Sequence, residues 1–127
     1  MPPYRLTDIS AVRSLMSRHG VDFKKSLGQN FLVAESVPRR IAAYAEGDRV
    51  LEIGPGIGTL TVELCRVCPQ VEAVELDRSL LPVLEETLAD FDCVRVTHAD
   101  FMKLDLEEFA AARFEGQPYS VAANLPY

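Results

Sequence analysis

The stretch that decides the fold is residues 50–58, which read VLEIGPGIG. The first four form a short, mostly apolar run typical of a buried strand, and three glycines follow at alternate positions. Glycines at this spacing let the backbone turn sharply and approach a ligand closely, and a helix that starts here presents unpaired N–H groups. The stretch therefore predicts a strand, a glycine-rich turn and a helix, with a ligand site at the turn.

The same alternation of strands and helices continues to the end of the chain. Short apolar runs predict strands at 50–53, 71–75, 94–97 and 119–123. The segments between them predict helices at 59–67, 80–88 and 104–112. Strands that alternate with helices of this length indicate an α/β fold with about four parallel strands and crossover helices.

The N-terminal part has a different pattern. Thr7 is placed to cap a helix whose apolar residues recur at helical spacing, and Ser36 is placed to cap a second helix. Between these helices lies a basic, glycine-containing loop at 23–32. We therefore divide the chain into an N-terminal helical segment, 1–47, that carries the loop, and a partial α/β domain, 48–127.

Composition narrows the class of protein. A chain of 127 residues with 48% apolar and 25% charged residues fits one globular domain. It has no apolar segment long enough to span a bilayer and no secretory signal, and its three cysteines lack a disulfide framework, so we expect a cytoplasmic protein without membrane contact. The net charge of −6 is uneven, because residues 1–40 hold seven basic and three acidic residues. Only this basic end suits contact with phosphates.

Glu75 strengthens the ligand hypothesis. It ends the second predicted strand, 21 residues after Gly54, where an acidic side chain can accept hydrogen bonds from ribose hydroxyls. A dinucleotide fingerprint would need a small residue at the position of Thr59, whereas the third glycine here comes one residue early, at Gly58. Glu52, just before the turn, suits a cofactor with a positively charged amino group. These features favour S-adenosylmethionine, and a purely structural tight turn is the alternative.

A second acidic residue, Asp100, follows the third predicted strand. Because the ends of parallel strands converge on one edge of the sheet, Asp100 is placed to accept a hydrogen bond from an adenine amino group. Phe101 or Met102 would then lie against the adenine ring. The pattern is equally compatible with an aspartate that only caps the next helix.

The last four residues, 124–127, read NLPY and follow the fourth predicted strand. The amide oxygen of Asn124 and the carbonyl of Leu125 could both accept hydrogen bonds from an exocyclic amine. Pro126 restricts the backbone beside that carbonyl, and Tyr127 offers a face on which an extruded base can stack. The structural alternative is a turn, because Asn and Pro are common turn residues.

Four motifs occur in order along the chain: LGQNFL at 27–32, EIGPGIG at 52–58, VELD at 74–77 and NLPY at 124–127. Together they closely resemble the ribosomal RNA adenine dimethyltransferase family, in particular its bacterial small-subunit branch. The resemblance implies a Rossmann-like class I methyltransferase fold, truncated after its fourth strand. It also implies S-adenosylmethionine-dependent dimethylation of the N6 amines of two adjacent adenosines in the 3′-terminal hairpin of 16S ribosomal RNA. The expected partner is an immature small ribosomal subunit.

The resemblance also assigns residues to the site. It implies cofactor contacts from Asn30, Leu32, Gly54, Glu75, Asp100 and Asn124, to which the residue patterns add Gly56, Gly58 and Phe101. The catalytic segment would be Asn124, Leu125, Pro126 and Tyr127, which position the target amine. No metal is expected, because the pair Cys65 and Cys68 has no second pair of ligands to complete a site.

Family members continue beyond the motif at 124–127 with further strands and a helical C-terminal domain, and we expect this chain to lack both. We therefore expect this chain to bind cofactor weakly, to be inactive alone, and to form a weak homo-oligomer through the exposed edge of the last strand. Three alternatives stay open: a large-subunit ribosomal RNA adenine methyltransferase of the macrolide-resistance type, a fragment of an NAD-binding oxidoreductase, and a non-catalytic binding module.

Overall fold

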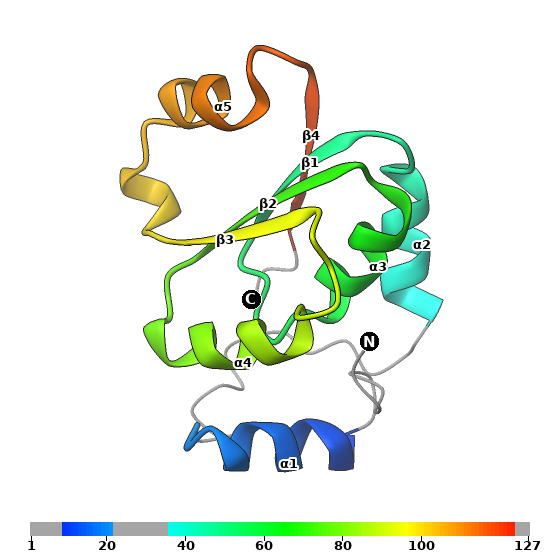
Figure 1. Ribbon diagram of the computed structural model, residues 1–127, viewed down its shortest axis with the longest axis vertical. Coiled ribbons are helices and arrows are strands. Elements are labelled where there is room, and N and C mark those ends of the chain that lie inside the picture. The colour runs from blue at the N-terminus through cyan, green and yellow to red at the C-terminus, as the bar shows by residue number, and fades with distance from the viewer. Residues whose placement is uncertain (1–8, 22–35, 124–127) are drawn as a thin grey trace.

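The computed structural model describes residues 9–21 and 36–123, and it contains a four-stranded parallel sheet (Figure 1). The strands lie in the order β3-β2-β1-β4. Their bounds are Arg49–Ile53 for β1, Gln70–Glu75 for β2, Val94–His98 for β3 and Tyr119–Ala123 for β4. All four predicted strands are present, so the expected α/β fold with about four parallel strands is confirmed.

Five α-helices are described, together with two short 3₁₀ segments. The α-helices are α1 (Ile9–Arg18), α2 (Ser36–Tyr44), α3 (Thr59–Val67), α4 (Leu81–Thr87) and α5 (Leu106–Phe114). The 3₁₀ segments, which precede α4 and α5, are η2 (Arg78–Leu80) and η3 (Phe101–Lys103).

The last helix begins two residues later than the sequence predicts. Asp105 supplies its N-terminal cap, because one carboxylate oxygen accepts a hydrogen bond of 3.1 Å from the backbone N–H of Glu108. The 3₁₀ segment η3 lies before the predicted helix start, and Asp100 caps it in the same way. An aspartate can satisfy the unpaired N–H groups of a helix start, and the apolar pattern alone did not separate these two caps.

The two faces of the sheet are covered by different helices. On one face, Val50 and Val71 pack in a cluster with Leu60 and Leu64 of α3. The opposite face packs against α5 through the cluster Leu51, Val74, Phe109, Ala110 and Phe114. The change of face follows from the topology, because the connection from β3 to β4 returns across the sheet to the far side of β1. The strand order therefore reverses between β1 and β4, where ligands bind in open α/β sheets.

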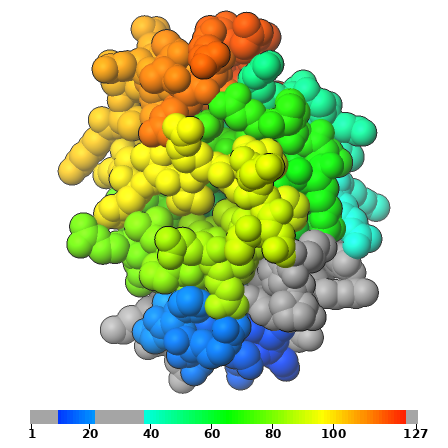
Figure 2. Space-filling model, in the orientation of Figure 1, coloured from blue at the N-terminus to red at the C-terminus, as the bar shows by residue number. Residues whose placement is uncertain are grey.

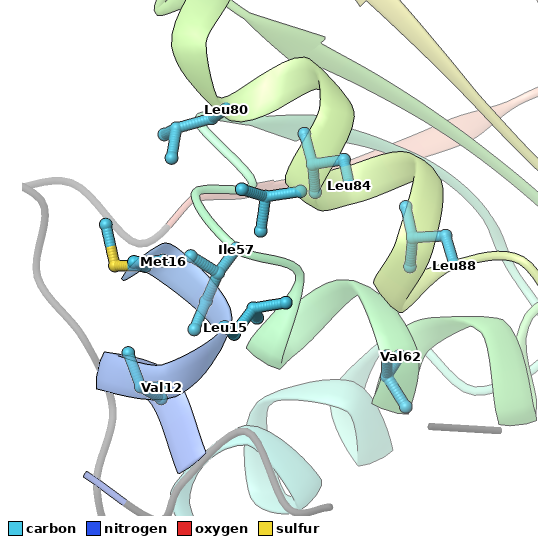
Figure 3. Packing of buried hydrophobic residues seen from close by; sticks show 9 residues of the cluster. Val12, Leu15, Met16, Ile57, Val62, Leu80, Leu84 and Leu88 are labelled. Atoms are coloured by element: carbon cyan, nitrogen blue, oxygen red, sulfur yellow. The ribbon is translucent and has the colours of Figure 1, made fainter. Parts of the chain in front are cut away.

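Helix α1 packs on the outside of the domain, against the glycine-rich turn and α4 (Figures 1 and 3). Its apolar side chains meet Ile57 of the turn in a cluster formed by Val12, Leu15, Met16, Ile57, Val62, Leu80, Val83, Leu84 and Leu88. At its C-terminal end, Nη1 and Nη2 of Arg18 donate hydrogen bonds to the carboxylate of Glu86 at 3.0 and 2.9 Å. Figure 2 shows α1 lying directly below α4 on this face of the molecule.

We predict that Leu15→Ala lowers the free energy of unfolding by about 2–5 kcal/mol, because Leu15 is fully buried between α1, the turn and α4. Urea unfolding followed by circular dichroism measures the loss. Ser17→Ala, an exposed position on the same helix, is the matched control and should change stability by less than about 0.5 kcal/mol. Equal stability of the two variants would show that α1 does not unfold together with the rest of the domain.

Candidate functional site

The glycine-rich turn has the tight, left-handed backbone that its sequence predicts. Gly56 and Gly58 have φ values of 61° and 98°. Residues with a Cβ rarely adopt this left-handed backbone conformation. The N–H of Gly58 donates to the carbonyl of Pro55 at 2.9 Å, which closes the turn. Gly54 extends the sheet by donating to Val74 at 2.9 Å, and Gly58 is the N-terminal cap residue of α3. The turn therefore leads directly from the central strand into the start of a helix.

Glu75 holds the turn against the end of β2. Its carboxylate accepts one hydrogen bond from the N–H of Gly56 at 3.0 Å and another from the N–H of Asp77 at 2.9 Å. Burial raises the pKa of this carboxyl above its ordinary value, and the two backbone hydrogen bonds oppose that increase. Each carboxylate oxygen has a second lone pair, so Glu75 can also accept hydrogen bonds from ligand hydroxyls while it keeps both backbone partners.

Glu52, on β1, is a second buried carboxylate beside the turn. It is fully buried, and one of its oxygens accepts a hydrogen bond from the hydroxyl of Thr61 on α3. The other oxygen, Oε2, has no hydrogen-bond partner among the described residues. Burial raises the pKa of Glu52 from 4.5 to about 7, with a smaller contribution from the charge of Glu75. A buried oxygen without a partner is costly, and a ligand donor would relieve that cost.

The structure gives Asp100 a capping role. One of its carboxylate oxygens accepts a hydrogen bond of 3.0 Å from the N–H of Met102, at the start of η3. The side chain of Phe101 is half-buried against the α5 cluster, whereas Met102 is 87% exposed. Of the two residues considered for contact with an adenine ring, Met102 is therefore the more accessible.

One exposed apolar residue at the carboxyl edge of the sheet was not predicted as part of the site. Leu76 directly follows Glu75 at the end of β2 and is 63% exposed. Its backbone carbonyl lies 3.1 Å from Nε2 of His98, the last residue of β3, so the ends of the two strands are joined. An exposed apolar residue directly after a strand-ending acid is the signal that could have identified it.

The other predicted site residues lie outside the described part of the chain. They are Asn30, Leu32, Asn124, Leu125, Pro126 and Tyr127. Strand β4 is described as far as Ala123, which pairs in register with Ile53, the last residue of β1. The described structure thus brings together Gly54, Gly56, Gly58, Glu75 and Asp100 at the carboxyl edge of the sheet.

The described residues contain neither a metal-binding cluster nor a membrane-spanning helix. Within 9–21 and 36–123, no group of three or more His, Cys, Asp or Glu side chains could hold a metal ion. In the same ranges, no helix is long and apolar enough to cross a membrane.

Known proteins resemble this chain over most of its length. A family model described as ribosomal RNA adenine dimethylase matches residues 20–127. The chain belongs to this family. Among curated relatives, the ribosomal RNA small subunit methyltransferase A of Clostridioides difficile is 40% identical over 97% of this chain and 44% of its own length. The corresponding protein of Ligilactobacillus salivarius is 47% identical over 91% of this chain and 40% of its own length. The chain thus spans less than half the length of these relatives.

Solved structures agree with this assignment. The crystal structure of the 23S rRNA methyltransferase ErmE matches 77% of this chain and 38% of its own, with a TM-score of 0.64 and 33% identity. A dimethyladenosine transferase from Plasmodium falciparum matches 70% of this chain and 31% of its own, with a TM-score of 0.52 and 24% identity. At that identity the second match supports the fold alone. The expected Rossmann-like class I methyltransferase fold is confirmed.

The raised pKa of Glu52 predicts a specific pH dependence of stability. The folded chain holds the Glu52 proton more tightly than the unfolded chain, so the free energy of unfolding falls as the pH rises from 4.5 through about 7. The loss amounts to about 3 kcal/mol and is absent from Glu52→Gln, which does not titrate. Urea unfolding of both proteins between pH 4.5 and 8 measures the difference.

The matched control is Glu107→Gln, an exposed position on α5. Its stability curve should run parallel to that of the parent chain over the same pH range. If the Glu52→Gln curve is also parallel to the parent, the carboxyl of Glu52 is not held in its protonated form by burial.

Proposed function

We propose that this chain forms the cofactor-binding part of an S-adenosylmethionine-dependent ribosomal RNA adenine dimethyltransferase. The observation that carries the proposal is the carboxylate of Glu75, buried at the carboxyl end of β2 between the N–H groups of Gly56 and Asp77. Family membership supports it, because the family is described by the same reaction. The relatives are more than twice as long as this chain, so methyl transfer is proposed for the whole enzyme.

The described residues suit the parts of this cofactor. Glu75 would accept hydrogen bonds from the ribose hydroxyls, and the backbone of the turn from Gly54 to Gly58 would lie along the methionine part. Oε2 of Glu52, which has no partner within the described part of the chain, would face the positively charged amino group, directly or through a water molecule. A positive charge there would stabilise the ionised carboxylate, whose burial is otherwise unfavourable.

The adenine end of the cofactor would lie between the ends of β2 and β3. Leu76 and Met102 are exposed apolar side chains on these two neighbouring strand ends, and both could contact the faces of the ring. Asp100 would accept a hydrogen bond from the adenine amine while one of its oxygens caps η3. Phe101 would contribute indirectly, because its side chain packs against the α5 cluster and so holds the neighbouring Asp100 in place.

The cofactor, when bound, would supply a methyl group on a positively charged sulfur. For the target adenosine we propose that Asn124 and the carbonyl of Leu125 accept hydrogen bonds from the N–H groups of the exocyclic amine. These bonds would draw the nitrogen out of conjugation with the ring and expose its lone pair for in-line attack on the methyl group. The nitrogen–carbon bond would form as the carbon–sulfur bond breaks, and the methylated amine would lose one proton to solvent. Pro126 would orient the carbonyl and Tyr127 would stack on the extruded base. Positioning alone can supply several kcal/mol, so no metal is needed. Asn30 and Leu32 are proposed as additional cofactor contacts.

The proposed substrate is the 3′-terminal hairpin of 16S ribosomal RNA in an immature small subunit, which places the enzyme in the cytoplasm. The curated relatives, described as small subunit methyltransferases, favour this RNA. A large-subunit substrate is the second candidate, because the 23S rRNA methyltransferase ErmE is a structural match. For this chain alone, we also propose weak self-association through the edge of β4, where Val121 is 55% exposed.

The cofactor proposal predicts that the chain binds S-adenosylmethionine and not NAD in a calorimetric titration. Glu75→Gln should weaken the binding by about 10-fold or more, because an amide offers one acceptor oxygen where the carboxylate offers two. The exposed Glu107→Gln variant is the control and should bind like the parent. Tight binding of NAD, or equal affinity of the parent and Glu75→Gln, would contradict the proposed site.

A further inference from the structure

We propose that Thr87, at the far end of α4, is a positioning residue for the glycine-rich turn. Its hydroxyl holds the Ile57–Gly58 peptide in the orientation that receives the cofactor. The inference rests on the proposed function only for the identity of the ligand. The contacts themselves belong to the chain without ligand.

The hydroxyl of Thr87 on α4 donates a hydrogen bond to the backbone of the glycine-rich turn. Thr87 is completely buried, and its Oγ1 donates to the carbonyl of Ile57 at 2.9 Å, across 30 positions of the chain. The carbonyl of Leu84, one turn earlier on α4, is a poorer partner at 3.5 Å. A buried carbonyl that loses its donor is costly, so the Ile57 carbonyl is held firmly in this direction.

Gly58, the next residue, leaves no room for a side chain beside the same hydroxyl. A Cβ built on Gly58 would lie 2.8 Å from Oγ1 of Thr87, closer than real Cβ contacts come. A side chain at position 58 would therefore displace the hydroxyl, quite apart from the positive φ of this residue. Threonine at 87 and glycine at 58 form one matched contact between α4 and the turn.

Both ends of the Ile57–Gly58 peptide are consequently fixed by the protein. Its carbonyl is bonded by Thr87, and its N–H donates to Pro55 at 2.9 Å. The side chain of Ile57, only 1% exposed, is held in the cluster with α1 and α4 (Figure 3). The peptide cannot rotate without breaking these contacts, so the turn is ordered before a ligand arrives and the entropic cost of binding is lower.

The test compares two substitutions at the same position. Thr87→Val keeps the shape of the side chain and removes the hydroxyl, whereas Thr87→Ser keeps the hydroxyl and removes a methyl group. Calorimetric titration with S-adenosylhomocysteine should show binding about 10-fold weaker for Thr87→Val and within about 2-fold of the parent for Thr87→Ser. A merely structural role would lower the stability of both variants and leave the affinity of the folded protein unchanged.

A second measurement needs no ligand and separates this inference from the proposed function. Amide hydrogen exchange of the ligand-free chain should be faster at Gly58 in Thr87→Val than in the parent. Exchange at Val71, inside the sheet, should change no more than the overall stability requires. If the parent chain does not bind S-adenosylhomocysteine, the proposed function fails and the exchange data alone decide the role of Thr87. Unchanged exchange at Gly58 overturns the inference, as does unchanged affinity of Thr87→Val where the parent binds.

Discussion

The geometry of the site depends on one buried carboxylate, that of Glu75. It accepts hydrogen bonds from Gly56, in the turn after β1, and from Asp77, in the segment after β2. Asp77 in turn caps η2 by accepting from the N–H of Ser79 at 2.9 Å, and this fixes the start of the segment that becomes α4. At the other end of α4, Thr87 bonds back to the turn. These hydrogen bonds connect the turn after β1, the end of β2 and both ends of α4 in one closed circuit. A movement of any one of these elements would break a hydrogen bond to another.

A second acidic side chain beside Glu75 makes this arrangement unfavourable for folding alone. Glu52 lies on the neighbouring strand, with its side chain fully buried and one oxygen without a partner in the described residues. Burial raises the pKa of Glu52, and the nearby charge of Glu75 raises it further. An apolar residue at position 52 would avoid the cost of burying a carboxyl group. The glutamate is therefore better explained by a role in binding a ligand than by a role in folding.

Features encoded locally could be predicted from the sequence, and contacts between distant segments could not. The alternation of apolar runs with helical segments predicted every strand, and the glycine spacing predicted the turn. The contact of Thr87 with Ile57 spans 30 positions and leaves no local pattern, since a threonine near a helix end is unremarkable in a sequence. The burial of Phe101 depends on where α5 returns over the sheet, so Phe101 and Met102 could not be ranked from their order in the chain.

The packing of α1 explains why a large apolar residue, Ile57, stands between Gly56 and Gly58 in the glycine-rich turn. Gly56 and Gly58 supply the backbone freedom, but Ile57 between them turns its side chain away from the ligand side and into the cluster formed by α1 and α4. A glycine at position 57 would leave Leu15 and Met16 of α1 without their partner in the turn. Because a fully buried aliphatic side chain contributes about 1.5–3 kcal/mol, Ile57 anchors the turn to the N-terminal segment as firmly as a hydrogen bond would. Helix α1 is thereby attached to the turn that connects the strand of Glu52 with α3 and that Glu75 holds from the end of β2.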